Sequence, residues 1–530
     1  MKLERLNASY MVVSTEISQR SEWEPLLHAL EGALLALPRN INPPERLGCP
    51  RHPHFDPTCN FCWVSFRPYN IYRLYRLWVE GKSLVFRIPI GGVMLILIKY
   101  KDKLPTSVFQ QIRNFLIQSY PPADTLQFKP EEFPSALYPY QLEAVQKSIK
   151  YRRCIISSPP GSGKTEIGSA LIASAPKDWT IGWFTHTRSL LRQSQERLRK
   201  NLREDIGAIS GEDDFSPRRV TVAMVQTITI RGQEKNDPNI IDWLRSLRLI
   251  VLDECHHAPA QTFYWTIMTC TNAWVRFGLT ATPMREESAE ELYIWSAFSP
   301  LIVEITPERL VSAGRLVPIY LVIYDLEPKP ITRTYANWQE EYMEHIVRNK
   351  IRNYIIAAES ILYRPTVILV WSLEHMNLIA QAINDLSKRF EIPVRVAVMH
   401  GGTPSRERMG ILYQFERGLL DILIISDVGK EGLNIINMRT LVVAAGQKSK
   451  VAAIQRVGRG LRPKKWGYVR VVDFYDPSET TRRHSFRRIR TYQQQLPIIK
   501  IERKRAEEGI EELVRLLQAQ KRTHSLFLET

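Results

Sequence analysis

The chain contains little cysteine and no long apolar segment. It has six cysteines in 530 residues, too few for a disulfide framework, so reduced thiols are expected for Cys154 and Cys255, which lie in apolar runs. The longest apolar runs, such as Val93–Ile98, fall far below the roughly 18 residues that span a bilayer. The first residues, MKLERLNASY, carry mixed charges where a signal peptide would be apolar. We therefore expect no membrane span and a reducing intracellular location: cytoplasm, nucleoid or the cytoplasm of an infected host.

Acidic residues are also in short supply. The chain has 72 Lys and Arg against 55 Asp and Glu, which gives a net charge of +17. A large polyanion is the first partner to consider, because neutralising phosphates and releasing their counterions favours binding. A solvated basic surface is the alternative. The length predicts three or four domains of about 100 to 200 residues each.

Two α/β units are predicted, because short apolar runs rich in β-branched residues alternate twice with helical patterns. The first occupies residues 131–304. The second occupies residues 305–475 and begins with a charged segment, Glu304 to Lys350, that is interpreted as a connector plus a helix. Residues 1–130 form an α+β N-terminal domain with a hairpin expected at Gly91-Gly92. Residues 476–530 are rich in Arg, Lys and Gln and predict a basic helical C-terminal extension.

A glycine-rich segment, SSPPGSGKTE at Ser157–Glu166, lies between a predicted strand and a predicted helix. This context is what a phosphate-binding loop requires, since backbone N–H groups at a helix N-terminus converge on the phosphates. The N–H donors are those of Gly161, Ser162, Gly163 and Lys164. The side chain of Lys164 is predicted to reach the β- and γ-phosphates, and Thr165 to bind magnesium. Ser158 stands where the full pattern has glycine, and a chance glycine-rich turn is the alternative.

The stretch LRLIVLDECHHAP, Leu247–Pro259, places two carboxylates, a cysteine and two histidines after an apolar strand. It is compatible with a transition-metal site, a nucleophile with its base, or the magnesium and water-activating end of a nucleotide-hydrolysing strand. Beside a phosphate loop in the same sheet, the last reading is favoured: Asp253 faces magnesium and Glu254 orients water. Adjacent residues at a strand end cannot wrap one zinc tetrahedrally. Cys255 is then a spacer and His256 a polar coupling residue.

At this point the sequence resembles the superfamily 2 helicases and translocases. The matching segments follow in order: LYPYQ (Leu137–Gln141), the phosphate loop, FTHTRSLLRQ, TVAMVQTI, DECH, GLTATP (Gly278–Pro283), VILVWSLEH, SDVGKEGLNI (Ser426–Ile435) and QRVGRGLR (Gln455–Arg462). Further segments are similar to the XPB group of DNA helicases and to phage UvsW-like branch-remodelling enzymes. The resemblance covers residues 131–475 and implies two RecA-like parallel-sheet lobes.

The resemblance also implies site residues and an activity. Gln141 would read adenine, Gly432 would contact the nucleotide, and Gln455, Arg459 and Arg462 would act from the second lobe, the arginines as fingers on phosphate charge. Thr187, Arg188, Gln226 and Thr227 are candidate nucleic-acid contacts. ATP and Mg²⁺ are the implied cofactors, and the implied activity is ATP-driven movement on duplex, forked or branched DNA, 3' to 5', including R-loops with an RNA-DNA hybrid. An RNA helicase, or a duplex-translocating motor subunit of a restriction or repair complex, remains the alternative.

A cysteine- and histidine-rich loop precedes the helicase-like region. In LGCPRHPHFDPTCNFCW, paired ligands at two-residue intervals indicate a structural zinc site formed by Cys49, His52, Cys59 and Cys62, with His54 as an alternative ligand. An ordinary loop with reduced thiols is the competing interpretation. The N-terminal domain is expected to grip DNA and to be the surface for protein partners.

The tail cluster RRHSFRRIR, Arg482–Arg490, is dense in positive charge that acidic residues nearby in the sequence barely oppose. It predicts nucleic-acid contacts from Arg482, Arg483 and Arg487. A solvated helix face is the alternative.

Overall fold

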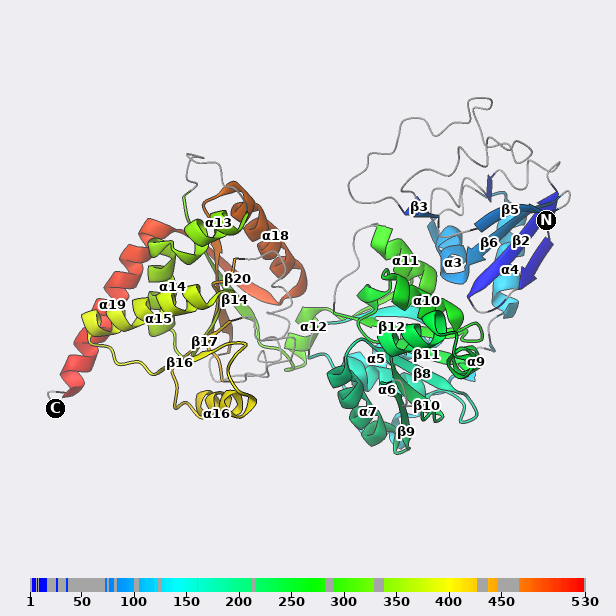
Figure 1. Ribbon diagram of the computed structural model, residues 1–530, viewed down its shortest axis with the longest axis horizontal. Coiled ribbons are helices and arrows are strands. Elements are labelled where there is room, and N and C mark those ends of the chain that lie inside the picture. The colour runs from blue at the N-terminus through cyan, green and yellow to red at the C-terminus, as the bar shows by residue number, and fades with distance from the viewer. Residues whose placement is uncertain are drawn as a thin grey trace, which may run out of the picture. The chain divides into compact units, whose positions relative to one another are not determined.

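The computed structural model describes residues 2–5, 7, 9–16, 25–26, 35–36, 72–73, 76–80, 83–99, 104–119, 121–122, 125–159, 161–211, 215–281, 289–327, 338–426, 437–446 and 467–528. The chain forms two compact units (Figure 1). One contains Met1–Ser158 and Gly163–Ile305, and the other contains Thr306–Thr530, with which Pro159–Ser162 is grouped. The division after Ile305 lies one residue from the predicted boundary between the lobes.

The first unit is built on a sheet of seven parallel strands. These are β7 (Arg153–Ser157), β8 (Ile181–Thr185), β9 (Ile206–Ile209), β10 (Val220–Met224), β11 (Leu249–Leu252), β12 (Val275–Thr280) and β13 (Ile302–Glu304). Their order is β13-β7-β12-β11-β8-β10-β9. Every residue of β7, β8, β10, β11 and β12 is buried, which explains why these strands are mainly apolar.

Helices cover both faces of this sheet (Figure 1). One group, in which consecutive helices contact one another, is α5 (Pro139–Tyr151), α6 (Lys164–Ala173) and α7 (Arg188–Leu202). The other packs around α10 (Gln261–Thr269) and contains α8 (Val225–Thr229), α9 (Pro238–Ser246) and α11 (Ala289–Ala297). Short helical turns lie at Pro130–Glu132, Ile230–Glu234 and Cys255–His257. The first predicted α/β unit is confirmed.

The N-terminal region adds a four-stranded antiparallel sheet to the same unit. Its order is β1 (Lys2–Arg5), β2 (Tyr10–Glu16), β6 (Ser83–Pro89) and β5 (Arg76–Glu80). Two helices follow, α3 (Ile90–Lys99) and α4 (Thr106–Ser119), and β3 (Leu35–Ala36) pairs with β4 (Tyr72–Arg73). The α+β character is as predicted.

The hairpin expected at Gly91-Gly92 is wrong, because α3 begins there instead. A Cβ atom at Gly91 would lie 1.9 Å from the carbonyl oxygen of Trp295. Glycine is therefore needed to let α3 approach α11, and not to make a turn. Val93, Leu95 and Ile96 on the same helix are buried in a core shared with the first lobe.

A buried arginine ties the N-terminal sheet to the first lobe. Arg276 in β12 is fully buried and donates to the Ser9 hydroxyl (2.7 Å) and to the carbonyl of Cys270 (2.9 Å). The same Ser9 hydroxyl donates to the carbonyl of Met268 (2.8 Å). The region predicted as a separate domain, residues 1–130, thus packs as part of the first unit.

The second unit has its own seven-stranded parallel sheet. Its strands are β14 (Ile319–Asp325), β15 (Thr366–Leu369), β16 (Val396–Met399), β17 (Ile422–Ile425), β18 (Thr440–Val443), β19 (Val469–Tyr475) and β20 (Ile498–Arg505). The order is β16-β17-β15-β18-β19-β14-β20. This confirms the second predicted lobe.

Its helices form two groups (Figure 1). In one, α14 (Lys350–Leu362), α15 (Leu373–Phe390) and α19 (Ala506–Leu528) contact one another. In the other, α18 (Glu479–Gln495) packs on β19 and contacts α13 (Trp338–Tyr342). The remaining helices are α12 (Pro307–Ser312), α16 (Ser405–Glu416) and the turn Met343–Val347.

Two strands of this sheet lie in segments predicted otherwise. β14 falls in the segment predicted as a connector plus a helix, and β20 in the predicted helical extension. β20 pairs with β14 along its whole length, so residues 498–505 are an edge strand of the lobe. The helical prediction holds for α18 and α19 and is wrong for β20.

Two expectations from composition can be compared with the structure. Among the described residues, no helix is long and apolar enough to cross a membrane. Cys154 and Cys255 are buried free thiols, as expected, and burial raises the pKa of Cys154 to about 12.

Candidate functional site

The glycine-rich loop turns the chain from the end of β7 into the N-terminus of α6. Gly161 (φ 83°) and Gly163 (φ 81°) both have left-handed backbone conformations, which glycine adopts without strain. Gly163 is the N-cap residue of α6, so the unpaired N–H groups of the first turn and the positive end of the helix dipole lie at the loop. This is the geometry of an anion site.

The Ser158 departure from the glycine pattern has a structural explanation. Ser158 is 1% exposed, and its backbone N–H donates to the carbonyl of Thr280 (2.9 Å). The Lys164 ammonium lies 3.4 Å from the Ser158 carbonyl oxygen. Position 158 thus contributes its backbone to the site, a role that does not depend on a glycine.

Gln141 is held against the loop from α5. Its side chain is 3% exposed and accepts a hydrogen bond from the N–H of Tyr138 (2.9 Å). A Cβ atom at Gly163 would lie 2.2 Å from the Gln141 amide nitrogen, so the two residues are in direct contact. Gln141 is thereby positioned beside the phosphate loop.

Asp253 and Glu254 follow β11 at the carboxyl edge of the sheet. The N–H of Asp253 donates to the carbonyl of Phe184 (3.0 Å), and the N–H of Glu254 to the Asp253 carboxylate (3.0 Å). Burial, and then the charge of Glu254, raise the pKa of Asp253 to about 6, against the opposing charge of Lys164. The structure therefore brings Lys164, Asp253 and Glu254 together electrostatically.

The backbone of Glu254 is strained. Its φ of 53° lies in the left-handed region, which costs a residue with a side chain of the order of 1–3 kcal/mol and is most often found at functional sites. Cys255 is fully buried, and a Cβ at Gly278 would lie 2.9 Å from its sulfur, consistent with a spacer. Among the described residues, no cluster of three or more His, Cys, Asp or Glu side chains could hold a metal ion.

Three histidines join this edge to the neighbouring strands. His256 Nδ1 lies 3.4 Å from the Glu254 carboxylate and 3.2 Å from the Thr280 hydroxyl at the end of β12, so its ring lies between these two groups. The rings of His256 and His257 are 4.2 Å apart, and those of His257 and His186 are 4.9 Å apart. Burial is the main cause that lowers the pKa of all three.

Thr280 and His186 were not recognised as site residues from the sequence. Thr280 is in the GLTATP segment and His186 follows β8 in FTHT, so each stands where a strand ends. Strand-end position in a parallel sheet is the signal that would have identified them.

The predicted nucleic-acid contacts of the first lobe lie next to one another. β8 and β10 are neighbours, with Thr185 opposite Met224, so the segments after both strands share an edge. Thr187 caps α7 through its hydroxyl, which accepts from the N–H of Leu190 (3.2 Å), and Arg188 is exposed. In α8, Gln226 is exposed and Thr227 is partly exposed.

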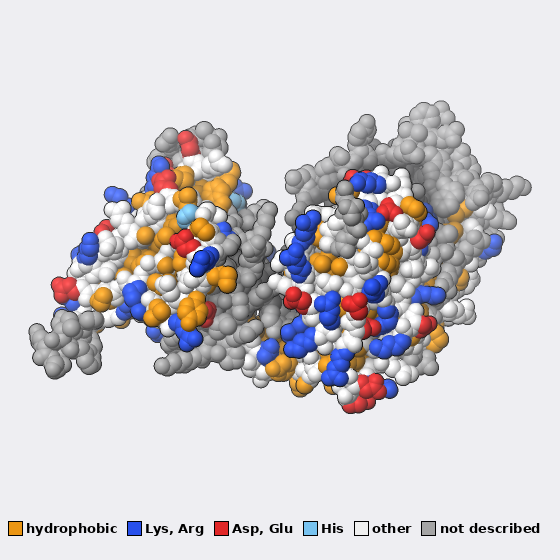
Figure 2. Space-filling view, turned by 60° about the horizontal axis from the view of Figure 1, so that its bottom comes forward, with side chains coloured by type: hydrophobic (Ala, Val, Ile, Leu, Met, Phe, Trp, Pro, Cys, Tyr) orange, Lys and Arg blue, Asp and Glu red, His pale blue; other side chains and the backbone are white. Residues whose placement is uncertain are grey.

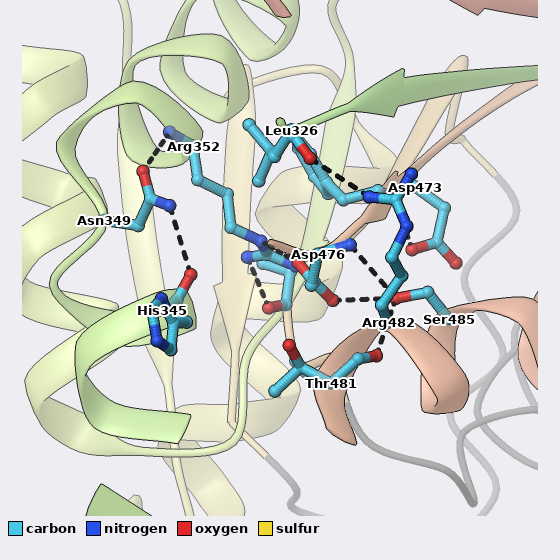
Figure 3. Close-up of polar contacts among 12 residues, drawn as sticks. Leu326, His345, Asn349, Arg352, Asp473, Asp476, Thr481, Arg482 and Ser485 are labelled. Atoms are coloured by element: carbon cyan, nitrogen blue, oxygen red, sulfur yellow. Dashed lines mark hydrogen bonds and ion pairs between the residues drawn. The ribbon is translucent and has the colours of Figure 1, made fainter. Parts of the chain in front are cut away.

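Part of the positive charge of α18 is balanced by acids within the fold, which the sequence analysis did not expect (Figure 3). Arg482 donates to the Asp325 carboxylate (2.8 Å) and to the Leu326 carbonyl (3.1 Å). Arg483 lies 3.3 Å from Glu479. Arg488 is fully buried and paired with Asp473 at 2.7 Å.

The fold brings these partners together. Asp325 is 157 residues from Arg482, so the sequence around the cluster gave no sign of this partner, and the nearby Asp473 meets Arg488 only because β19 and α18 pack together. Arg487 is exposed, like Arg483. These two remain candidate nucleic-acid contacts.

Several predicted site residues lie outside the described residues. They are Cys49, His52, His54, Cys59 and Cys62 of the zinc hypothesis, and Gly432, Gln455, Arg459 and Arg462 of the second lobe.

Comparison with known families gives two matches that follow the two lobes. Residues 135–285 match the family described as "Type III restriction enzyme, res subunit". Residues 349–464 match the helicase conserved C-terminal domain.

Curated relatives agree with these matches. The chain is 25% identical over 370 residues to the "DNA 3'-5' translocase XPB2" of Sulfurisphaera tokodaii, covering 61% of this chain and 78% of the relative. It is 24% identical over 336 residues to the "ATP-dependent DNA helicase uvsW" of phage T4, covering 61% of this chain and 65% of the relative. Four other relatives are matched over only 50% to 59% of their length.

A solved structure supports the fold. The type ISP restriction-modification enzyme LlaBIII bound to DNA superposes with a TM-score of 0.51 at 12% identity, covering 73% of this chain and 33% of that one. With two parallel-sheet lobes, a phosphate loop beside a strand-end Asp-Glu pair, and a helicase-type family match in each lobe, the chain resembles the superfamily 2 helicases of the XPB and UvsW type.

Proposed function

We propose that this protein is an ATP-dependent DNA helicase or translocase that unwinds or remodels duplex or branched DNA in the 3' to 5' direction. The observation that carries the proposal is the meeting of the Gly161–Thr165 loop with Asp253 and Glu254 at one edge of one sheet. The XPB2 relative is a DNA 3'-5' translocase and the uvsW relative is an ATP-dependent DNA helicase. Both support DNA as the substrate, and XPB2 supports the polarity.

The phosphate loop fits a triphosphate. Left-handed glycines direct backbone N–H groups to the start of α6, and Lys164 supplies a cation there. Gln141, packed against Gly163, is placed to read the base attached to those phosphates. The loop would orient the γ-phosphate, while the N–H groups and Lys164 offset its charge.

The carboxylates fit a magnesium ion. Asp253 and Glu254 are adjacent, and the pKa of Asp253 is raised to about 6. A bound divalent cation would stabilise the charged form of these carboxylates. Thr165 and Asp253 would hold the ion, which offsets charge on the β- and γ-phosphates. Glu254 then accepts a hydrogen bond from the attacking water and orients it.

His256 links this chemistry to the sheet. It lies between the Glu254 carboxylate and the Thr280 hydroxyl, so a displacement at the end of β12 changes the position of Glu254. By resemblance, Gly432 contacts nucleotide, and Gln455, Arg459 and Arg462 complete the site from the second lobe, where the arginines stabilise transition-state charge.

The DNA strand is proposed to contact Thr187, Arg188, Gln226 and Thr227. Their common edge after β8 and β10 supports one continuous contact. Figure 2 shows Lys and Arg side chains more frequent than acids on the face in view of the first unit, in line with the net charge of +17. ATP and DNA are both intracellular, and we propose that location for the protein.

A second candidate is a duplex translocase within a larger complex. The match of residues 135–285 to a restriction-enzyme subunit favours it. Such a motor would be stimulated by duplex DNA without separating strands.

The test is ATP hydrolysis and strand separation by the purified full chain on single strands, forks, four-way junctions, RNA and RNA-DNA hybrids. We expect stimulation by DNA and separation of duplexes that carry a 3' single-stranded tail. Lys164→Ala should abolish both, while Lys177→Ala, an exposed lysine after α6, should not. Stimulation by RNA alone would replace the proposal with an RNA helicase, and stimulation without strand separation would favour the second candidate.

A further inference from the structure

An exposed basic and aromatic surface lies on the second unit and includes the exposed arginines of α18. It consists of the outer side of α18 and the adjacent face of the edge strand β20. The phenyl ring of Phe486 on α18 is 51% exposed. On β20, Ile499 and Ile501 are 63% and 38% exposed. Large apolar side chains in this setting indicate a binding surface.

Strand order explains why this face is open. In the sheet, β20 lies outside β14 and β19, with Asp325 of β14 paired in register with both Tyr475 and Arg505. Helix α18 is tied to β19 and β14 by Arg488–Asp473 and Arg482–Asp325. It therefore covers these two strands, and the outermost strand projects beyond it.

Phe486 is supported from beneath by aromatic and cationic groups. Its ring centroid lies 4.7 Å from that of Tyr475, which is 5% exposed at the end of β19. The Arg482 guanidinium lies 5.6 Å from the Tyr475 ring and 5.8 Å from the Phe486 ring. Arg503 of β20 lies 5.8 Å from the Tyr475 ring. The exposed phenyl ring is thus packed against a buried tyrosine ring and an arginine.

The charge around this ring is positive. On α18, Arg483, Arg487 and Arg490 are exposed at helical spacings of three and four, which places them on one side. Arg503 adds a cation from β20. Among the described residues of this surface, the acids are Asp325 and Glu479, and each is paired with an arginine of α18.

A network of buried ion pairs holds the platform in place (Figure 3). The Asp473 carboxylate accepts from Arg488 and from the Tyr492 hydroxyl (2.8 Å). The Asp476 carboxylate accepts from Arg352 of α14 (2.9 Å) and from the Ser485 hydroxyl (3.0 Å). Because Ser485 and Arg488 flank Phe486 and Arg487, the exposed residues are presented from a fixed backbone.

We propose that this surface, defined by Phe486, Arg487, Arg490 and Arg503, is a second nucleic-acid site that binds unpaired single strands. A base stacks on Phe486, and the arginines contact phosphates on either side. An aromatic ring among cations suits a single strand, because every base has a face that can stack and the backbone is uniformly anionic. A duplex, with its bases already stacked, gains nothing from Phe486. The inference rests on the proposed function, since it adds a site for a separated strand.

The test uses the full-length protein and a fluorescein-labelled oligo(dT) strand, with binding followed by fluorescence anisotropy over a range of salt concentrations. Phe486→Ala should weaken binding about 5- to 100-fold, the range for loss of one stacked base. Phe486→Trp should retain it, and Phe486→Leu should resemble the alanine variant. Arg503→Ala should lower the slope of log affinity against log salt by about 0.7, the value for one single-strand phosphate contact.

Matched controls are available on α19. Leu516→Ala removes a side chain that is 38% exposed, and Arg515→Ala an exposed arginine beside it. Both should bind the strand like the wild type. Thermal melting of each variant should match the wild type, since none of these side chains is buried.

The outcomes separate this inference from the proposed function. If the wild type binds DNA and its ATPase is stimulated, but Phe486→Ala binds equally well, the platform is wrong and the helicase stands. If Phe486→Leu binds like the wild type, any apolar side chain is sufficient at position 486. This result would contradict base stacking and would favour a protein partner for the surface. If the wild type neither binds DNA nor responds to it, the proposed function itself fails.

Discussion

The two lobes have the same parallel architecture but differ in whether the carboxylates at their strand ends are neutralised by arginines. In the first lobe, Asp253 and Glu254 follow β11, and Lys164 is the cation that opposes the rise in the Asp253 pKa. In the second, Asp473 and Asp476 at the end of β19 are fully buried and paired with Arg488 and Arg352. One lobe keeps its negative charge available for a ligand, and the other uses it for structure.

Neutralisation explains the difference. A buried carboxylate without a full counter-charge destabilises the fold, and this cost is relieved when a cation binds. A carboxylate bound by a buried guanidinium has its charge balanced within the fold, and removing either partner is costly. Substitutions should therefore alter activity in the first lobe and stability in the second.

The largest expected effect is in the first lobe. Glu254→Gln should lower kcat for ATP hydrolysis by about 10²- to 10⁴-fold, because the water is no longer oriented by a carboxylate. Nucleotide binding, measured at equilibrium with a fluorescent ATP analogue, should persist. The matched change Glu143→Gln on the exposed side of α5 should leave turnover intact. Glu254→Gln turnover within threefold of wild type would show that the base is assigned wrongly.

The counterpart in the second lobe is Arg488→Met. It leaves Asp473 buried without its guanidinium partner and should cost about 3–5 kcal/mol in the free energy of unfolding, measured by chemical denaturation. Arg487→Met, one residue away and exposed, should unfold like the wild type. The double variant Arg488→Met/Asp473→Leu should regain much of the loss. Equal unfolding midpoints for the two single variants would contradict the structural role.

A smaller effect concerns pH. The pKa of Asp253 is raised from 3.8 to about 6 on folding, so between these values the folded state binds more protons than the unfolded state. Stability contributed by this group is therefore lost as pH rises from about 4 to 6. Without ATP and magnesium, Asp253→Asn should melt above the wild type at pH 7.5 and show a flatter pH dependence. Parallel melting curves for the two proteins would refute the assignment.

The smallest expected effect is on DNA-stimulated kcat and comes from His256. His256→Ala removes the link between Glu254 and Thr280, and loss of about 1 kcal/mol of hydrogen bonding corresponds to roughly a 5-fold fall in DNA-stimulated kcat. His256→Asn, which can still bond to Thr280, should restore part of it. If only stability changes and the ratio of stimulated to basal ATPase does not, His256 is not a coupling residue.

Local sequence predicted what depends on local geometry. The phosphate loop, the strand-end Asp-Glu pair and both buried sheets could be identified because glycine conformations, helix starts and apolar runs are encoded within a few residues. What failed depended on distant contacts. Gly91-Gly92 indicated a turn, but glycine is needed at position 91 because the carbonyl of Trp295 lies close to it. The charge of Arg482 and of Arg488 is neutralised by acids in other elements.

The edge strands show the same limit. β20 contains Lys500, Arg503 and Arg505, residues that a composition reading assigns to a basic helix. Its exposed and part-buried residues alternate near its end because one face packs on α19 and the other is open. Residues 498–505 can be identified as a strand only from their pairing with β14.

The position of β14 sets an order of events during synthesis. Ile319 is the first residue of this strand, yet it pairs with Val469 and Ile498, which are 150 and 179 residues later in the chain. Contacts this far apart are slow to form. A chain emerging from the ribosome would thus complete its first sheet before β14 has any partner, and this apolar strand would stay unpaired until β19 and β20 have been made.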